Sequence, residues 1–188
     1  NQRNGVRTTM FTNFKVDTHI EFSNSFGVIH TIGIRNIGIK SLDETINQVT
    51  YDKIKRRAFL LGTGLALKTG NFNKHFFIYG GGEYELAFHY RQKIYTSTFK
   101  SILRQGEWFS SATERFLPSI FAGIQFTNGI NIQTKYYLKD FLNHSYNGVL
   151  GDFTKFTQSH LFYLSFTLQF KDKKFPKVKE TKPEIIDL

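Results

Sequence analysis

Apolar and polar residues alternate with a period of two along most of this chain. Over residues 6–23 every even position is apolar or threonine, whereas Lys15, Asp17, His19 and Glu21 stand at odd positions. A helix does not produce this pattern, but a strand does, because its successive side chains point to opposite faces. We therefore predict a long strand over residues 6–23.

The same alternation predicts six further strands. In each of them one face is almost wholly Phe, Ile, Leu, Val and Tyr, and the other face is polar or small. We expect these strands over residues 26–39, 57–68, 76–91, 116–126, 130–139 and 160–170. Strands of this length exceed the roughly five or six residues that are usual in soluble sheets.

The connections between these strands alternate in length. Short ones at 24–25, 69–75 and 127–129 alternate with long polar ones at 40–56, 92–114 and 140–158. Transmembrane barrels have short periplasmic turns and longer outer loops. We therefore predict an all-β fold, an antiparallel up-and-down transmembrane β-barrel of about eight strands, over residues 1–170. A soluble sandwich or lipocalin-like barrel is the alternative, since it can follow the same meander.

Composition is compatible with this prediction. The chain lacks an apolar run of about 18 residues, which argues against a membrane-spanning helix but not against a barrel, whose strands are apolar only at alternate positions. It contains no cysteine, as suits a chain that crosses an oxidising compartment. No secretory signal is visible, and we expect an exported protein to have lost it in processing.

The last predicted strand carries a resemblance. Its sequence, SHLFYLSFTLQF, alternates and closes on the aromatic Phe170. It resembles the terminal strand of outer-membrane barrels, whose final Phe is recognised by the assembly machinery. With the short-turn, long-loop pattern, residues 6–170 look like a small porin-like barrel of the Bacteroidota type. The resemblance implies an integral outer-membrane protein with extracellular loops, and it implies no particular activity.

The strand count departs from that family. We count seven strands, whereas single-chain bacterial barrels have an even number. If the last strand descends to the periplasm, the strand at 6–23 also descends. We therefore expect one ascending strand upstream of Asn1, either lost from this chain or supplied by another.

The polar face of the strands predicts a charged barrel interior. An eight-stranded barrel is just wide enough for side chains to fill it, and buried charges of both signs would neutralise one another. We predict a polar interior network of Lys15, Asp17, Glu21, Arg35, Glu83, Glu85 and Lys135. We place His89 and Arg91 on the same face. A proton or ion path, or a catalytic pair at Glu83 and Glu85, is the alternative to a structural plug.

Candidate catalytic and metal-binding residues are weak. Lipid A deacylases of the outer membrane have a His and a Ser separated by one residue, whereas His144 and Ser145 are adjacent and would point to opposite faces of a strand. The six histidines do not fall at short ligand spacing. The glycines at 80–82 are not followed by a phosphate-binding helix, and we expect them to relieve crowding. We therefore predict no catalytic, cofactor-binding or metal-binding residue.

The formal net charge of +10 indicates an anionic partner. The basic residues concentrate in loops and near strand ends: Lys53, Lys55, Arg56, Arg57, Arg91, Lys93, Lys100, Arg104 and Arg115. On the outer side of a membrane they would meet the phosphates of lipopolysaccharide. Nucleic-acid binding, as by an OB-fold, is the less favoured alternative, and we expect no nucleic-acid partner.

The final segment, residues 171–188, differs in composition from the rest. It is rich in Lys and Pro, has no periodicity and cannot bury a core. We expect it in the periplasm, either as a disordered tail or as a tether that docks on a partner through Ile185, Ile186 and Leu188.

Together these features predict a non-enzymatic structural or accessory subunit of an outer-membrane complex for secretion, insertion or uptake. Its expected partners are outer-membrane lipid, lipopolysaccharide and other outer-membrane or periplasmic subunits. A lipid A-modifying enzyme and a free-standing adhesion barrel are the alternatives.

Overall fold

The computed structural model describes residues 14–46, 49–96, 101–156 and 158–168. In these residues the fold is all-β, apart from the short 3-10 helix Phe72–Lys74. No helix in the described ranges is long and apolar enough to cross a membrane. The start of the first predicted strand, Lys100 and the tail with Ile185, Ile186 and Leu188 lie outside these residues.

One antiparallel sheet contains nearly all the strands. Its path runs β1-β2-β3-β4-β6-β7-β10, and β5 pairs with β4 alongside that path. The strands are β1 (Phe14–Glu21), β2 (Phe26–Ile46), β3 (Val49–Asn71), β4 (Phe76–Tyr95), β5 (Ser101–Trp108), β6 (Phe116–Gln125), β7 (Ile130–Tyr137) and β10 (Phe162–Leu168). The short strands β8 (Asn147–Gly148) and β9 (Gly151–Asp152) form a separate ribbon.

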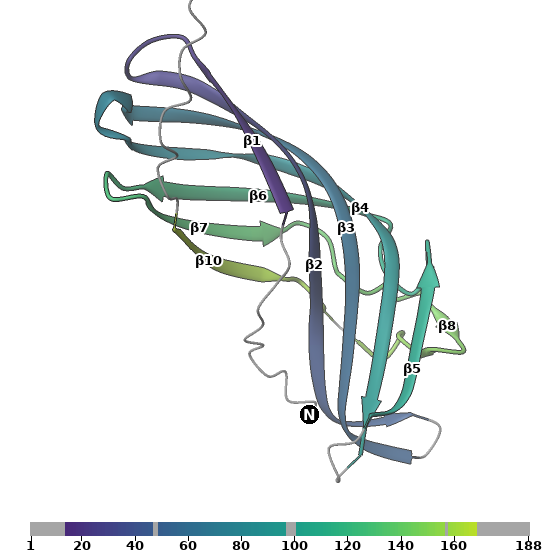
Figure 1. The fold of residues 1–188 in the computed structure, drawn as a ribbon. Coiled ribbons are helices and arrows are strands. Elements are labelled where there is room, and N and C mark those ends of the chain that lie inside the picture. Colours follow the sequence, from purple (N-terminus) through teal and green to yellow (C-terminus); the bar gives the residue numbers. More distant parts are fainter. Residues whose placement is uncertain (1–13, 47–48, 97–100, 157, 169–188) are drawn as a thin grey trace, which may run out of the picture.

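The sheet is strongly bent but open in the part of the chain that is described (Figure 1). β1 forms one edge and β10 the other. Six successive antiparallel pairings link them, so β1 and β10 run in the same direction. The predicted all-β antiparallel meander is confirmed, whereas no barrel closure is present among the described strands.

Two of the predicted long connectors are mostly strand. β2 and β3 pair continuously from Phe26 opposite Thr69 to Ile46 opposite Val49, across the segment predicted as a loop at 40–56. β5 occupies part of the predicted connector at 92–114 and pairs with the second half of β4. Backbone hydrogen bonds extend both hairpins into segments where polar residues interrupt the apolar alternation, so the alternation understated the length of these hairpins.

The third long connector folds back onto the sheet. Thr113 and Leu142 form an isolated bridge between the loop before β6 and the loop after β7. From the same connector, Phe141, Leu150 and Phe153 are buried in one cluster with Leu60 of β3 and Tyr90 of β4. These loops therefore contribute an apolar cluster to the fold.

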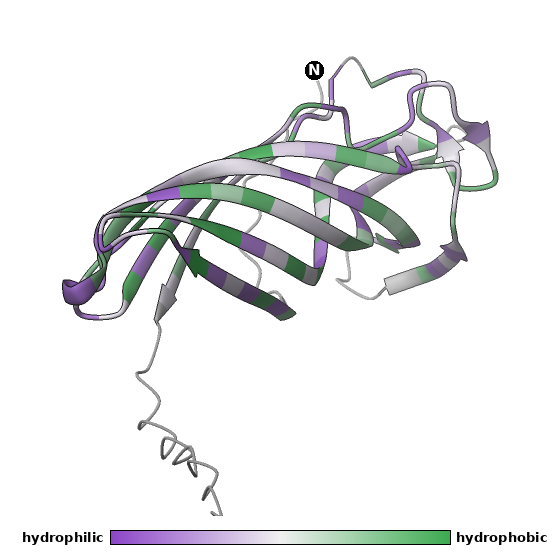
Figure 2. Cartoon of the chain, turned by 90° about the horizontal axis from the view of Figure 1, so that it is seen from above, coloured by the Kyte–Doolittle hydropathy of each residue, from purple (hydrophilic) through white to green (hydrophobic). Residues whose placement is uncertain are grey.

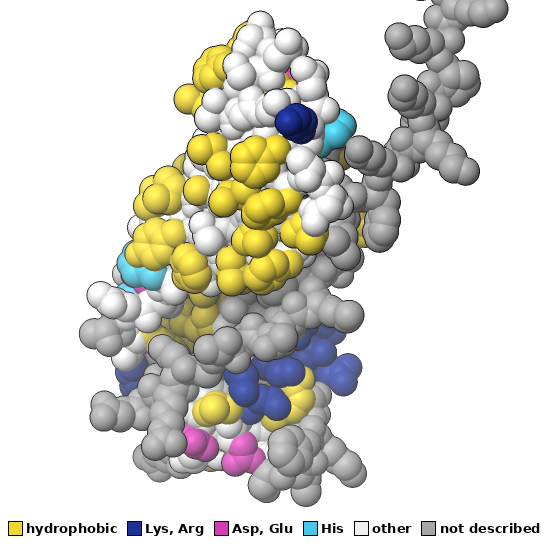
Figure 3. Space-filling model, turned by 90° about the vertical axis from the view of Figure 1, so that its left-hand side faces the viewer, with side chains coloured by type: hydrophobic (Ala, Val, Ile, Leu, Met, Phe, Trp, Pro, Cys, Tyr) yellow, Lys and Arg dark blue, Asp and Glu magenta, His cyan; other side chains and the backbone are white. Residues whose placement is uncertain are grey.

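The two faces of the sheet have opposite chemistry. On β3, Leu65 and Leu67 are each 60% exposed, whereas Lys68 is 1% exposed. Figure 2 shows the alternation as bands of hydrophobic and hydrophilic residues along each strand. Figure 3 shows a broad patch of hydrophobic side chains on one side of the molecule, with Lys and Arg side chains gathered below it. We call the face that carries Lys68 the inner face and the opposite one the outer face.

Candidate functional site

Four charged side chains meet on the inner face, and we call them the charged layer. Arg35 comes from β2, Glu83 and Glu85 from β4, and Lys135 from β7. Arg35 Nη2 lies 2.9 Å from Glu83 Oε1, and Arg35 Nε lies 2.8 Å from Glu85 Oε1. Lys135 Nζ lies 2.8 Å from Glu83 Oε2 and 2.7 Å from Glu85 Oε2. Each base therefore contacts both carboxylates, and the four charges cancel.

Glycines on β3 make room for the two carboxylates. Gly62 pairs with Glu85, and Gly64 pairs with Glu83. A Cβ on Gly62 would lie 2.5 Å from Glu85 Cγ, and a Cβ on Gly64 would lie 3.1 Å from Glu83 Cβ. The two glutamate side chains therefore lie over glycine backbone that carries no side chains. This leaves them room to reach the basic side chains of Arg35 and Lys135.

Three members of the charged layer are almost fully removed from water, and the fourth, Arg35, is 16% exposed. The side chains of Glu83, Glu85 and Lys135 are 2%, 1% and 3% exposed. Burying an ion costs several kcal/mol, and this cost is recovered only where partners satisfy it. Both carboxylates are bound by two cations, so neither is available as a free acid or base. This geometry favours a structural role over the catalytic pair considered for Glu83 and Glu85.

The predicted network members on β1 do not join the charged layer. Lys15 and Asp17 form an ion pair with each other at 3.0 Å, and Asp17 also accepts a hydrogen bond from Thr31 at 2.7 Å. Glu21 pairs instead with Lys68, whose Nζ lies 2.6 Å from Glu21 Oε1. The seven predicted residues therefore form three separate groups.

Sequence reasoning missed Lys68 as an inner-face residue. Its Nζ also lies 3.1 Å from His19 Nδ1 and 4.2 Å from the centre of the Phe72 ring. The signal was present in the pattern, because Lys68 follows Gly62, Gly64 and Ala66 at even positions of one strand.

Arg56 is a correction to the predicted set of outer basic residues. It is buried, and its Nη2 lies 2.5 Å from Glu44 Oε1. The guanidinium carbon lies 5.0 Å from the Phe153 ring centre and 5.3 Å from that of Phe156. Arg56 therefore anchors the folded loop to the β2–β3 hairpin, because its strand position is that of the inner face.

His89 and Arg91 are a second correction. A bulge shifts the register between β3 and β4, so that Leu60 pairs with Ala87 but Phe59 pairs with His89. The extra residue, Phe88, reverses the facing of β4 beyond that point. His89 and Arg91 therefore lie on the outer face, opposite to Glu83 and Glu85.

Apolar clusters lie on both sides of the charged layer. Towards the short turns the buried cluster consists of Ile29, Ala66, Phe72, Phe77, Tyr79 and Phe121. Towards the long hairpins the folded loops complete a larger cluster that includes Leu117, Tyr137, Phe141, Leu142, Leu150 and Phe153. The inner face is thus filled in three successive levels.

A hollow of about 1110 Å³ remains between the two edges of the sheet. Asp17 and His19 line it from β1, and Leu164 and Phe166 line it from β10. Arg35 borders it from β2. The hollow therefore lies where the sheet is open.

A serine, two histidines and an aspartate meet in the folded loop. Ser159 Oγ donates to Asp140 Oδ1 at 3.2 Å and accepts from the Leu142 backbone N–H at 3.0 Å. His144 Nε2 lies 3.4 Å from Ser159 Oγ, and His160 Nε2 lies 3.9 Å from Asp140 Oδ1. The carboxylate binds the serine directly instead of orienting His144, which a catalytic triad requires. These four side chains therefore hold the loop between β7 and β10 in its folded conformation.

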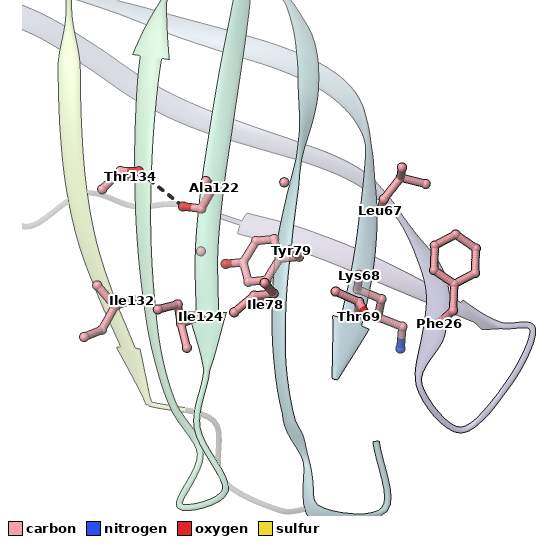
Figure 4. A pocket seen from close by; sticks show the side chains of 12 residues that line it. Phe26, Leu67, Lys68, Thr69, Ile78, Tyr79, Ala122, Ile124, Ile132 and Thr134 are labelled. Atoms are coloured by element: carbon pink, nitrogen blue, oxygen red, sulfur yellow. Dashed lines mark hydrogen bonds between the residues drawn. The ribbon is translucent and has the colours of Figure 1, made fainter. Parts of the chain in front are cut away.

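No three His, Asp or Glu side chains within the described residues are grouped as a metal ion would need. A depression of about 650 Å³ lies on the outer face around Gly80 and Ala122. Leu67, Ile78 and Ile124 border it (Figure 4). A Cβ on Gly80 would meet only the Phe121 carbonyl oxygen at 3.6 Å and the Ala122 Cβ at 4.0 Å, so the depression arises from small side chains on an apolar surface.

Comparison with protein-family models, with curated proteins and with solved structures found no match to this chain, so its function has to be inferred from its own residues and geometry.

Proposed function

We propose that this chain is an integral β-barrel protein of an outer membrane and acts there as a non-enzymatic structural subunit of a larger assembly. The observation that carries the proposal is the reversed chemistry of the sheet. The inner face buries ions, and the outer face exposes large apolar side chains on every strand of the main path.

The exposed apolar residues form a band around the sheet. Its members include Phe14, Val16, Ile32, Ile34, Leu61, Leu65, Leu67, Ile78, Tyr84, Ile120, Phe162, Leu164 and Phe166. Contiguous exposed apolar patches above a few hundred Å² are rare in soluble monomers and mark contact with a membrane or another protein. Lipid around the outer face would cover the apolar side chains of every strand, whereas a single protein interface would cover those of only some strands.

The open edges support a missing strand. In lipid every backbone polar group needs a partner, and each unpaired group costs several kcal/mol. Since β1 and β10 run in the same direction, one strand antiparallel to both closes the sheet as an eight-stranded barrel. Its inward side chains would occupy the hollow that Asp17 and Phe166 border.

The filled interior supports a structural role. The charged layer and the two apolar clusters occupy much of the inner face, and Asp17, His19 and Arg35, which border the hollow, each contact another charged side chain. The hydrogen bonds around Ser159 hold the loop in place and do not form a catalytic triad. We therefore rank lipid A modification below a structural role. The surfaces that remain for partner subunits are the outer hairpins and the tail at 171–188.

The first prediction concerns location. The native protein should remain with membranes through a carbonate wash, and it should migrate faster on gels when it is not heated, as folded barrels do. After mild detergent extraction it should run in a complex with other membrane proteins. Recovery as a soluble protein without detergent would contradict the barrel, and recovery as a bare monomer would contradict the subunit role.

A further inference from the structure

Beyond the apolar band, the outer face of the long hairpins carries a two-dimensional array of basic residues. We call it the basic ladder, and its members are Lys53, Lys55 and Arg57 on β3, Arg91 and Lys93 on β4, and Arg104 on β5. The outward positions of residues 53–57, 91–95 and 104–106 hold no acidic residue.

The register sets like charges directly opposite one another. Arg57 is paired with Arg91, and Lys55 is paired with Lys93. Lys93 is in turn paired with Arg104. Side chains at directly opposite positions have Cβ atoms about 4.5–5.5 Å apart, and like charges there are destabilising. The fold therefore brings Arg57, Arg91, Lys93 and Arg104 close together, while Lys53 and Lys55 lie over the Tyr95 ring, at 5.1 and 5.2 Å from its centre.

The bulge at Phe88 creates this array. Without the extra residue, Arg91 and Lys93 would follow Glu83 and Glu85 onto the inner face. With it, they stand beside Arg57 instead. A bulge that re-aims side chains is commonly found next to a functional site.

The electrostatics of the ladder are those of a site for an anion. The pKa of Lys93, which lies beyond the apolar band, is lowered by partial loss of hydration; Tyr95 acts in the opposite direction, and the charges of Arg91, Arg104 and Arg57 lower the pKa further. The Arg57 Nε is buried and has no hydrogen-bond partner among the described residues. A phosphate group would relieve the repulsion and accept from this guanidinium, because Arg matches phosphate geometry with two parallel hydrogen bonds.

The position of the ladder identifies the anion as part of a lipid. Phe59 is the next outward residue after Arg57, and it lies against His89, with ring centres 5.7 Å apart. Trp108, 70% exposed, packs on His89 at 4.8 Å. Aromatic residues of this kind mark the boundary between hydrocarbon and headgroups, so the ladder begins where headgroups are found.

We propose that the basic ladder binds the phosphates of a lipid headgroup in the outer leaflet, with the acyl chains of that lipid lying along the apolar outer face. The lipid class is a phosphorylated glycolipid such as lipid A. This site rests on the proposed function, since the acyl chains need a lipid-facing surface.

Native mass spectrometry of the full-length protein, purified from membranes in dodecyl maltoside, tests the site. The probes are diphosphoryl lipid A, the same lipid with its phosphates removed, and inorganic pyrophosphate. We expect diphosphoryl lipid A to bind, and the double variant Arg57→Gln/Lys93→Gln to weaken binding roughly tenfold or more, because two charge-assisted contacts are lost. The control Lys74→Gln/Lys155→Gln removes the same charge at exposed positions elsewhere and should leave the affinity unchanged.

Three results would overturn the site: equal weakening in both double variants, equal binding of the two lipids, or pyrophosphate competing as well as the phosphorylated lipid. Migration of each unheated variant on gels shows, independently of the binding measurement, whether that variant is folded. If Arg57→Gln/Lys93→Gln does not fold, the single variant Lys93→Gln replaces it, with Lys155→Gln as its control, and unchanged binding of diphosphoryl lipid A by Lys93→Gln would also count against the proposal. Release of the wild-type protein from membranes by the carbonate wash would instead contradict the proposed barrel itself.

Discussion

At the scale of single residues, glycine and glutamate act together on the inner face. Gly62 has no side chain because the space its Cβ would need is taken by Glu85. Gly82, on the neighbouring strand, faces outward, and a Cβ there would meet only the Ser119 carbonyl oxygen, at 3.7 Å. A side chain at Gly62 would therefore clash with a neighbouring residue, whereas a small side chain at Gly82 would have room.

This difference predicts the effects of two single substitutions. Gly62→Ala should lower the free energy of unfolding by about 1–3 kcal/mol, because it overpacks the buried carboxylates. Gly82→Ala is the matched control and should change it by less than about 0.5 kcal/mol. Urea unfolding of the protein folded in detergent micelles, followed by tryptophan fluorescence of Trp108, measures both. Equal effects of the two variants would contradict the packing of Glu85 over Gly62.

At the scale of elements, the directions of the two edge strands limit how the sheet can close. β1 and β10 run in the same direction and border a common hollow. Direct closure would pair them in parallel, whereas a strand between them keeps every pairing antiparallel. An intervening strand separates the edges by about 9–10 Å, twice the spacing of neighbouring strands.

Engineered cysteines distinguish the two closures, because the chain has no cysteine of its own. A disulfide needs Cα atoms no more than about 7 Å apart. Val16→Cys combined in turn with cysteine at Phe162, Leu164 or Phe166 should therefore give no intramolecular disulfide under oxidation in membranes. Val16→Cys with Ile32→Cys, a directly paired position, is the positive control. A disulfide in any of the three test pairs would refute the intervening strand.

At the scale of the whole molecule, the inner face is filled in three levels. The cluster around Phe77, the charged layer and the loop cluster around Phe153 succeed one another from the short turns to the long hairpins. Water-filled porins use barrels of about 16–18 strands, and a barrel of about eight strands leaves room only for side chains. Shape and filling therefore both predict that the proposed barrel does not conduct ions or small solutes.

A swelling assay tests this prediction. Vesicles containing the reconstituted protein should admit small sugars and ions no faster than protein-free vesicles, because the three levels of side chains and the proposed intervening strand would together fill the interior. Gel migration of the protein recovered from the vesicles checks that it is folded. Vesicles containing a general porin provide the positive control. Uptake above the protein-free rate would show an open path through the charged layer and revive the ion-path alternative.

The sequence by itself determined the meander of seven strands and most of their facing, but it did not reveal β5 or the parts of β2 and β3 between residues 40 and 56. A period of two is a local property, so the alternation around Glu83 or Lys135 is legible without knowledge of any other strand. The apolar outer face and the polar inner face follow from it. The three short turns also follow, because they interrupt the alternation with turn-forming residues.

Only the tertiary structure decided which residues meet. Arg35 and Glu83 are distant in sequence, and their contact depends on the register of three strands. The bulge at Phe88 reverses the facing of Arg91, and the fold of a distant loop buries Arg56 against Phe153. Register, bulges and loop packing are set by pairing between remote segments of backbone, which a local pattern does not encode.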